Sequence, residues 1–203
     1  MTGHLDNRRA IFRDPDGVDA TWVHRDARTG FECASIRARG DGHRLVGHTC
    51  AIEDGVSWAV GYVVDVDAQW RTIGAELTET RSGYRTTLSI QTDRAGRWMI
   101  DGAPCPELDE CIDIDLESSA LTNTIFLHRV QPSSADVYDA PASFIRCAPL
   151  RPERLDQTYR LTTQNRIGVS YAYTSPAYGT DIELHFDDAG LVLDYPGLAI
   201  RHS

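Results

Sequence analysis

The sequence predicts an all-β protein built mainly from antiparallel strands, with at most short helices. Apolar and polar residues alternate with a period of two from about residue 30 to the C-terminus. Turn pairs such as Asp41-Gly42, Asp54-Gly55 and Asp101-Gly102 separate these runs. No segment carries an apolar stripe of helical spacing longer than three turns. These observations together predict about ten to thirteen strands joined by tight turns.

The alternating runs follow one another along the chain. The longest places apolar residues at every second position, and these are Trp58, Val60, Tyr62, Val64 and Val66. Similar runs cover residues 84–91, 112–117, 167–173 and 182–186. Residues 118–124 are the best candidate for a short helix or loop, because Ser and Thr can cap a helix and no long apolar face follows them.

Length and composition indicate one globular domain. The chain has 203 residues, of which 41% are hydrophobic and 25% charged, close to the globular average. We expect a single domain over residues 19–203, because no linker rich in Gly, Ser or Pro divides it. Residues 1–18 are charged and contain Asp14-Pro15-Asp16-Gly17, which predicts an N-terminal arm.

Two hairpins in the sequence resemble each other. TLSIQTDRAGRWMIDG begins at Thr87 and DIELHFDDAGLVLDYPG begins at Asp181, and their turns start at Asp93 and Asp187, 94 residues apart. Two explanations are open. An internal duplication would produce two similar antiparallel sheets that pair into one curved wall, whereas β-hairpins in general share this pattern.

Charge and residue spacing exclude several classes of function. The chain carries 20 basic and 30 acidic residues, a net charge of −10, which argues against nucleic-acid binding. No apolar run approaches about 18 residues, so we expect no stable membrane insertion, and the first residues lack a signal-peptide core, which predicts a cytoplasmic protein. Five cysteines without a CxxC pair and seven scattered histidines predict no metal or other cofactor.

The segment CIDIDLESSALTNTIFLHR, residues 111–129, contains the strongest candidate site. Asp113 and Asp115 lie on one face of a strand, about 7 Å apart, and Asn123 and Arg129 follow. One hypothesis is a polar patch that hydrogen-bonds sugar hydroxyls or a headgroup. A second is a solvated outer face with loop-capping residues. A third is a structural pair, with Arg129 bound to Asp113 or Asp115 inside the fold.

Large aromatic residues concentrate in the predicted strands. Four Trp and eight Tyr residues occur in the chain, and many amphipathic rings on a curved sheet can line a cavity for an acyl chain or a sugar. The alternative is ordinary core packing. The candidates are Trp22, Trp58, Trp70, Trp98, Tyr62, Tyr84, Tyr159, Tyr171, Tyr173 and Tyr195.

Several blocks of the sequence resemble the bacterial family described as "putative glycolipid-binding". The blocks are YVVDVDAQWR from Tyr62, DRAGRWMIDG from Asp93, DIDLESSALTNTIFLHR from Asp113, QTYRL from Gln157 and DAGLVLDYPG from Asp188. The resemblance covers about residues 20–200. It implies an open antiparallel β half-barrel, similar to bacterial lipoprotein carriers and mycobacterial glycolipid-binding lipoproteins, and it implies a lipid or glycolipid ligand. The chain departs from the family pattern at residues 118–121 and 126–128.

We therefore predict a binding protein for an amphipathic ligand, a lipid or glycolipid, held in a β-lined cavity without catalysis. The alternative is a hydrolase that acts on a lipid or sugar conjugate with Asp113 or Asp115 as acid or base. The oligomeric state is not predicted. The candidate ligand-binding residues are Trp70, Arg71, Trp98, Asp113, Asp115, Asn123, Arg129, Tyr171 and Tyr173.

Overall fold

One open sheet of fourteen strands dominates the computed structural model, which describes residues 12–26, 28–93, 95–131, 136–165 and 168–202. Its N-terminal half is a run of sequential hairpins, each strand pairing antiparallel with the next. These strands are β1 (Asp19–His24), β2 (Thr29–Arg39), β3 (Gly42–Glu53), β4 (Val56–Val66), β5 (Thr72–Arg81), β6 (Tyr84–Thr92), β7 (Trp98–Ile100) and β8 (Ala103–Pro104).

The C-terminal half joins the same sheet through its last strand. β17 pairs antiparallel with β1, and Trp22 lies opposite Arg201. The order continues outward to β10, so the sheet has β10 at one edge and β8 at the other and does not close. The strands of this half are β10 (Val137–Asp139), β13 (Thr158–Gln164), β14 (Val169–Ser175), β15 (Thr180–Phe186), β16 (Val192–Tyr195) and β17 (Ala199–Arg201).

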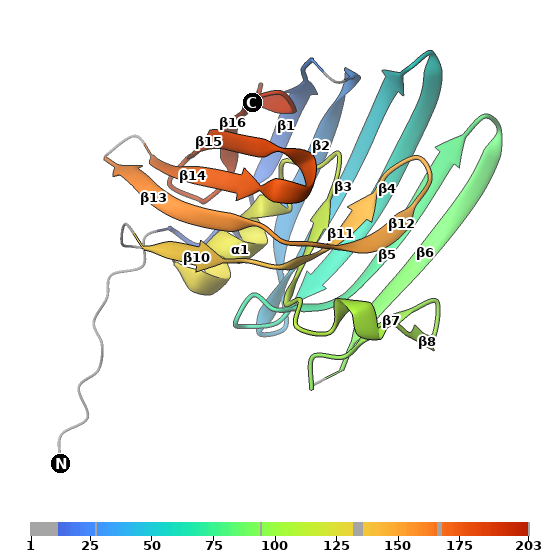
Figure 1. The fold of residues 1–203 in the computed structure, drawn as a ribbon, viewed down its shortest axis with the longest axis horizontal. Helices are drawn as coiled ribbons and strands as arrows, with labels where there is room; N and C mark the ends of the chain where they lie inside the picture. Colours follow the sequence, from blue (N-terminus) through green and yellow to red (C-terminus); the bar gives the residue numbers. More distant parts are fainter. Residues whose placement is uncertain (1–11, 27, 94, 132–135, 166–167, 203) are drawn as a thin grey trace.

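A second, smaller layer lies inside the curve of this wall. Figure 1 shows the blue-to-green strands as the wall, with the orange and red strands folded across it and helix α1 between them. The small sheet has the order β12-β11-β9, formed by Arg151–Leu155, Ala142–Arg146 and Asp113–Leu116. The helices are α1 (Asn123–Val130) and two 3-10 turns, Pro106–Leu108 and Pro176–Tyr178. The prediction of an all-β, open antiparallel half-barrel with only short helices is confirmed.

The core follows from the alternation in the sequence. Trp58, Val60, Tyr62, Val64 and Val66 are all at most 4% exposed, so the predicted inward face of β4 is confirmed. These residues belong to one cluster of buried apolar side chains that draws on both halves of the chain. Ile167 and residues 1–11 of the predicted arm lie outside the described residues.

Three local predictions need correction. The described residues form seventeen strands, more than expected, because strands of two or three residues such as β8 and β17 are too short to show alternation. Residues 118–122 form a loop, and the helix begins only at Asn123 and ends at Val130; residues 123–128 are all buried, which removes any amphipathic stripe. β9 is buried on both faces and pairs parallel with β11, so its polar face is not solvated.

The two similar hairpin turns are built alike, and a third turn shares their design. In each, one Asp carboxylate oxygen accepts two backbone N–H groups, two and four residues further along the chain. The Asp residues are Asp67, Asp93 and Asp187. The position with positive φ is Gly96 or Gly190 in two turns and Trp70 in the third. The likeness of the hairpins therefore extends to local turn chemistry, and duplication stays a prediction.

Candidate functional site

A buried carboxylate anchors the loop after β9 to the inner face of the wall. Glu32 occupies an inward position of β2 and is fully buried. It accepts hydrogen bonds from the Tyr62 hydroxyl at 2.5 Å, the Ser119 hydroxyl at 2.5 Å and the Ala120 N–H at 2.7 Å. Burial raises the pKa of Glu32, and the three donors oppose that shift. The loop that carries the candidate residues is thus held at a defined place.

A cavity of about 450 Å³ lies beside this loop, between the small inner sheet and the C-terminal strands. Its wall combines aromatic and aliphatic side chains with several polar ones. The apolar part includes Leu116, Phe144, Leu155, Tyr173, Tyr178, Ile182, Tyr195 and Leu198. The polar part includes Arg28, Asp115, Glu117, Ser119, Asn123, Ser175, Thr180 and Asp181. This composition and volume are typical of a small-molecule site, which spans about 300–1,000 Å³.

Asp115 and Asn123 bring polar chemistry to the cavity from adjoining elements. The Asp115 carboxylate accepts a hydrogen bond from the Thr122 hydroxyl at 2.8 Å. Burial, with a smaller contribution from the nearby charge of Asp113, raises the pKa of Asp115 to about 7. The Asn123 carbonyl oxygen accepts the Tyr159 hydroxyl at 2.7 Å, which fixes the side-chain amide. A protonated Asp115 can donate a hydrogen bond as well as accept one.

Asp113 and Arg129 form a bidentate ion pair away from the cavity wall. Arg129 Nε lies 2.8 Å from Asp113 Oδ1, and Arg129 Nη2 lies 2.6 Å from Oδ2. The pair is almost fully covered, with 3% of the Asp113 side chain and 16% of the Arg129 side chain exposed. Burial raises the pKa of Asp113, and Arg129 opposes that shift. The geometry matches the structural pair that the sequence left open as one hypothesis.

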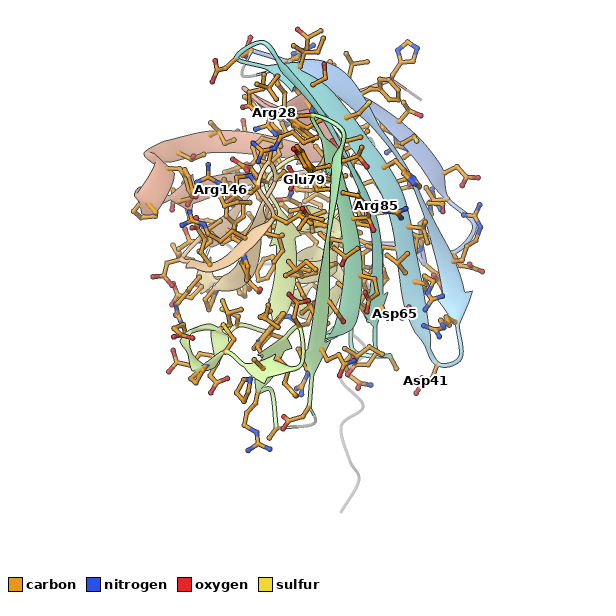
Figure 2. All side chains as sticks on the ribbon, turned by 90° about the vertical axis from the view of Figure 1, so that its right-hand side faces the viewer. Arg28, Asp41, Asp65, Glu79, Arg85 and Arg146 are labelled. Atoms are coloured by element: carbon orange, nitrogen blue, oxygen red, sulfur yellow. The ribbon has the colours of Figure 1, made fainter. Side chains whose placement is uncertain are left out.

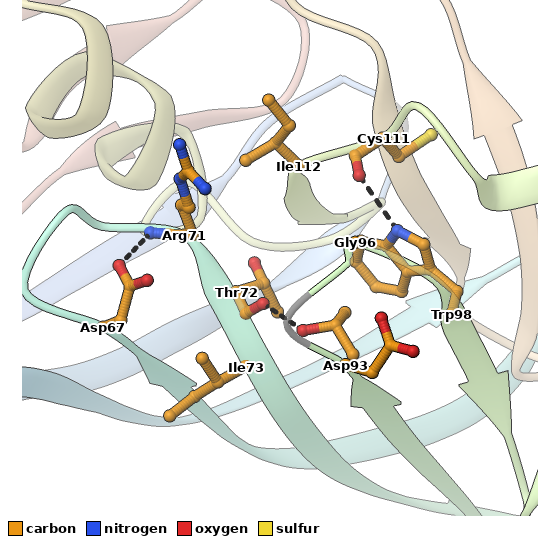
Figure 3. A pocket seen from close by; sticks show the side chains of 10 residues that line it. Asp67, Arg71, Thr72, Ile73, Asp93, Gly96, Trp98, Cys111 and Ile112 are labelled. Carbon is orange, nitrogen blue, oxygen red and sulfur yellow. Dashed lines mark hydrogen bonds between the residues drawn. The ribbon is translucent and has the colours of Figure 1, made fainter.

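Arg71 and Trp98 line a different, smaller hollow of about 240 Å³. Figure 3 shows it between the Asp67 and Asp93 turns, with Thr72, Ile73 and Ile112 on its wall. The Trp98 indole is 1% exposed and donates to the Cys111 carbonyl at 2.9 Å. The structure therefore separates these two candidates from the Asp115 cavity.

Trp70 and Tyr171 pack in the interior and line neither hollow. Trp70 stacks between His43 and His128, at ring-centroid distances of 4.6 and 4.3 Å. His128, at one of the departures from the family pattern, also lies 2.9 Å from the Ala189 carbonyl. Tyr171 is fully buried in edge contacts with neighbouring rings. The predicted residues that line the 450 Å³ cavity are Asp115, Asn123 and Tyr173, whereas Arg71 and Trp98 meet at the 240 Å³ hollow.

Sequence reasoning missed several residues of the site. Glu32 had a readable signal, because an acidic side chain alternates with Ala34 and Ile36 on the inward face of β2. Arg28 had none, because it precedes β2 in a loop and reaches the cavity only through the fold. Phe144 and Leu155 lie on β11 and β12, and only the fold brings them to the same cavity wall as residues of β14 and β15.

Metal-ligand clusters and membrane-spanning helices are both absent from the described ranges. No group of three or more His, Cys, Asp or Glu side chains in these ranges is arranged to hold a metal ion. The described helices are all too short or too polar to cross a bilayer.

Comparison with known proteins agrees with this architecture. A DUF1089 family protein from Pseudomonas aeruginosa has a crystal structure with TM-score 0.71 and 26% identity, over 84% of this chain and 92% of that one. A β-barrel-like protein of domain of unknown function DUF1849 from Brucella abortus has TM-score 0.52 and 9% identity, over 90% and 92%, which supports the fold alone. No curated protein matches. The model of the family described as "putative glycolipid-binding" matches residues 19–201, so the chain belongs to that family.

Proposed function

We propose that this protein binds an amphipathic molecule, a lipid or glycolipid, in the 450 Å³ cavity and does not transform it. The observation that carries the proposal is the composition of the cavity wall. Rings and aliphatic side chains offer an apolar surface, while Asp115, Asn123 and Arg28 offer polar groups at the same cavity. Apolar burial stabilises a bound chain by about 0.8 kcal/mol per CH₂, and the polar groups would orient the headgroup. Membership of the family supports a lipid-type ligand.

The proposal also includes the cellular location of the protein and its domain organisation. We infer a cytoplasmic protein, in line with five cysteines that are all free. We also infer one domain over residues 19–203, in line with the single core cluster. Cell fractionation with antibody detection tests the first inference, and an unfolding experiment given below tests the second.

Binding is tested by displacement of a fluorescent fatty acid and a fluorescent glycolipid from the purified protein. Two matched substitutions distinguish the hollows, because Ile182 lines the 450 Å³ cavity and Ile73 lines the 240 Å³ hollow. We expect Ile182→Trp to fill the cavity and weaken binding at least about tenfold. Ile73→Trp and the outward-facing Ile52→Trp should bind like the parent protein. If Ile182→Trp binds the probes as tightly as the parent protein and keeps its circular dichroism spectrum, the ligand binds outside this cavity.

A second candidate function is hydrolysis, favoured by one specific observation. Asp115 has a pKa of about 7 at a cavity wall, which suits a general acid or base near neutral pH. The second carboxylate of the predicted pair, Asp113, is engaged by Arg129 and does not line the cavity. Glu117, two residues after Asp115, does line it. Turnover of chromogenic esters or glycosides that is lost in Asp115→Asn would establish hydrolysis and overturn the binding-only proposal.

A further inference from the structure

Arg28 presents a buried, largely unpaired guanidinium at the cavity. The residue lies between β1 and β2 and lines the cavity wall, with only 6% of its side chain exposed. Figure 2 labels it where the long sheet meets the C-terminal strands. Its Nε and Nη1 have no hydrogen-bond partner among the described residues. Its one ion pair with a described residue is long, with Nη2 3.6 Å from the Glu53 carboxylate.

A buried guanidinium with unpaired N–H groups destabilises the fold unless a further acceptor pairs with it. Burial of a charge without hydrogen-bonded compensation is strongly unfavourable, and native proteins rarely leave such groups unpaired. The Trp58 ring lies under the guanidinium, with Arg28 Cζ 5.5 Å from its centroid, but a ring face does not accept the in-plane N–H groups. The Trp58 indole nitrogen is also buried without a partner in the described part of the chain. The unsatisfied groups of Arg28 and Trp58 are all N–H donors, so the partner that they lack is an acceptor.

The other charges of the cavity do not supply that acceptor. The Glu117 carboxylate is already engaged, by the Arg146 Nε at 3.1 Å and by the Cys147 N–H at 2.8 Å. Burial favours the neutral form of Asp115 by raising its pKa, and Asp181 lies exposed at the rim. Arg28 is the single cationic side chain among the described residues that line the cavity. A negative group that enters the cavity therefore has one favourable partner.

We propose that Arg28 pairs with the anionic group of the ligand, so that the cavity selects an acidic amphiphile over a neutral one. The shared chemistry is a carboxylate, phosphate or sulfate attached to an apolar body. Arg is suited to these oxygen anions because its guanidinium carries several fixed donors and stays charged. The inference rests on the proposed binding function and specifies its ligand class.

The test compares ligands of equal chain length that differ only in headgroup charge. Hexadecanoate, hexadecyl phosphate and the neutral hexadecanol compete with a fluorescent fatty acid for the purified protein. We expect the parent protein to bind the two acids about 10- to 100-fold more tightly than the alcohol. Arg28→Gln should abolish that preference by lowering the affinity for both acids to about the affinity for hexadecanol. Arg28→Lys should retain part of it, because it keeps the charge but not the geometry.

Controls separate this proposal from the binding function itself. Arg25→Gln changes a nearby arginine that lies outside the cavity wall, and it should bind like the parent protein. Equal affinity of the parent protein for acids and alcohol, with binding still lost in Ile182→Trp, overturns the role of Arg28 and leaves the binding function standing. Failure of all three amphiphiles to bind removes both.

Two further measurements test whether the anion must carry an apolar body and whether Arg28 is an uncompensated buried charge. Inorganic phosphate alone should not displace the probe at concentrations where hexadecyl phosphate does, and equal displacement would overturn the proposal, because the apolar body would then contribute nothing. Arg28→Gln should be at least as stable as the parent without ligand, since it removes an uncompensated buried charge. If that variant fails to fold, the preference of the parent protein and of Arg28→Lys still decides the question.

Discussion

Asp113 and Asp115 stand two residues apart on β9 and have different surroundings. Asp113 is neutralised by the bidentate contact with Arg129, whereas the only side-chain donor to Asp115 among the described residues is the Thr122 hydroxyl. The alternation in the sequence puts both on one polar face, and on a solvated strand the two carboxylates would have equivalent surroundings. The fold covers β9 on both sides, so desolvation acts on both carboxylates and only Asp113 has a cation to oppose it.

Replacement of Asp115 by Asn should flatten part of the dependence of stability on pH. The folded-state pKa of Asp115 is about 7, whereas the ordinary pKa of an aspartate is 3.8. Between these values the folded protein binds more protons than the unfolded chain, so the free energy of unfolding decreases as pH rises. Asn stays neutral and still accepts the Thr122 hydrogen bond. Relative to the parent protein, Asp115→Asn should therefore gain stability from pH 5 to pH 8, on the order of a few kcal/mol.

Urea unfolding of both proteins at several pH values measures this difference. Other buried acids such as Glu32 titrate in both proteins and cancel in the comparison. Asp181→Asn, at the exposed rim of the same cavity, serves as the control and should follow the parent protein. Parallel curves for Asp115→Asn and the parent would show that Asp115 titrates normally.

At the scale of elements, the packing of β3 against β4 positions the loop that carries the site. Gly47 of β3 lies opposite Tyr62 of β4. A Cβ atom at Gly47 would lie 2.2 Å from the Cζ and hydroxyl oxygen of Tyr62, so the ring lies across the glycine. From there its hydroxyl reaches Glu32, which also holds Ser119 and Ala120. Residue 47 must therefore be a glycine, because a side chain there would occupy the position of the Tyr62 ring.

Gly47→Ala should consequently destabilise the protein and loosen the loop. The added methyl group must displace the Tyr62 ring and break its hydrogen bond to Glu32, at a cost of about 1–3 kcal/mol. Gly61→Ala is the matched control, because its Cβ would meet only the His48 ring, at 3.1 Å, on the outward face. Thermal unfolding of the two variants provides the comparison. A Gly47→Ala protein as stable as the control would rule out the crossing of Tyr62 over Gly47.

Helix α1 is docked from the opposite side, by the turn between β15 and β16. The Thr124 hydroxyl donates to the Gly190 carbonyl at 2.9 Å, and His128 lies 2.9 Å from the Ala189 carbonyl. Asp187 shapes this turn through its bonds to the Ala189 and Leu191 N–H groups. Asn123, the first residue of the helix, is thereby brought to the cavity wall. The site thus depends on contacts between segments more than 60 residues apart.

At the scale of the whole molecule, the first and last strands join the two halves. β1 pairs with β17, and the Trp22 indole donates to the Val192 carbonyl at 2.7 Å within the same region. The buried cluster extends from Phe12 to Ala199 without a break between halves. We therefore expect neither half to keep its own core when the other is removed.

We expect a single cooperative unfolding transition on this basis. The four Trp residues all lie in the N-terminal half, and six of the eight Tyr residues lie in the C-terminal half, among them Tyr159, Tyr171 and Tyr173 with their edge contacts. Trp fluorescence therefore reports on the first half and Tyr absorbance mainly on the second. Urea transitions followed by Trp fluorescence, Tyr absorbance and far-ultraviolet circular dichroism should share one midpoint. Two separate midpoints would divide the chain into two folding units and contradict the single domain.

The sequence by itself determined the strand-rich fold, the inward face of β4 and the design of the Asp93 and Asp187 turns. These features depend on local rules: side chains alternate across a strand, and an Asp at a turn binds nearby backbone N–H groups. Together with the resemblance of its motifs, they were sufficient to identify the family. The segment 111–129 was also singled out, because Asp113 and Asp115 share one face of a strand and Asn123 and Arg129 follow them.

Only the tertiary structure decided which of those residues meet. The parallel pairing of β9 with β11 buries both acids, and parallel neighbours cannot be read from a period of two. The fold assigns Arg129 to Asp113 and leaves Asp115 at the cavity, and it brings Arg28 there from a loop 87 residues earlier. The physical reason is the same in each case. A cavity is a space between segments distant in sequence, so its wall depends on long-range packing, whereas alternation and turn chemistry depend on neighbours along the chain.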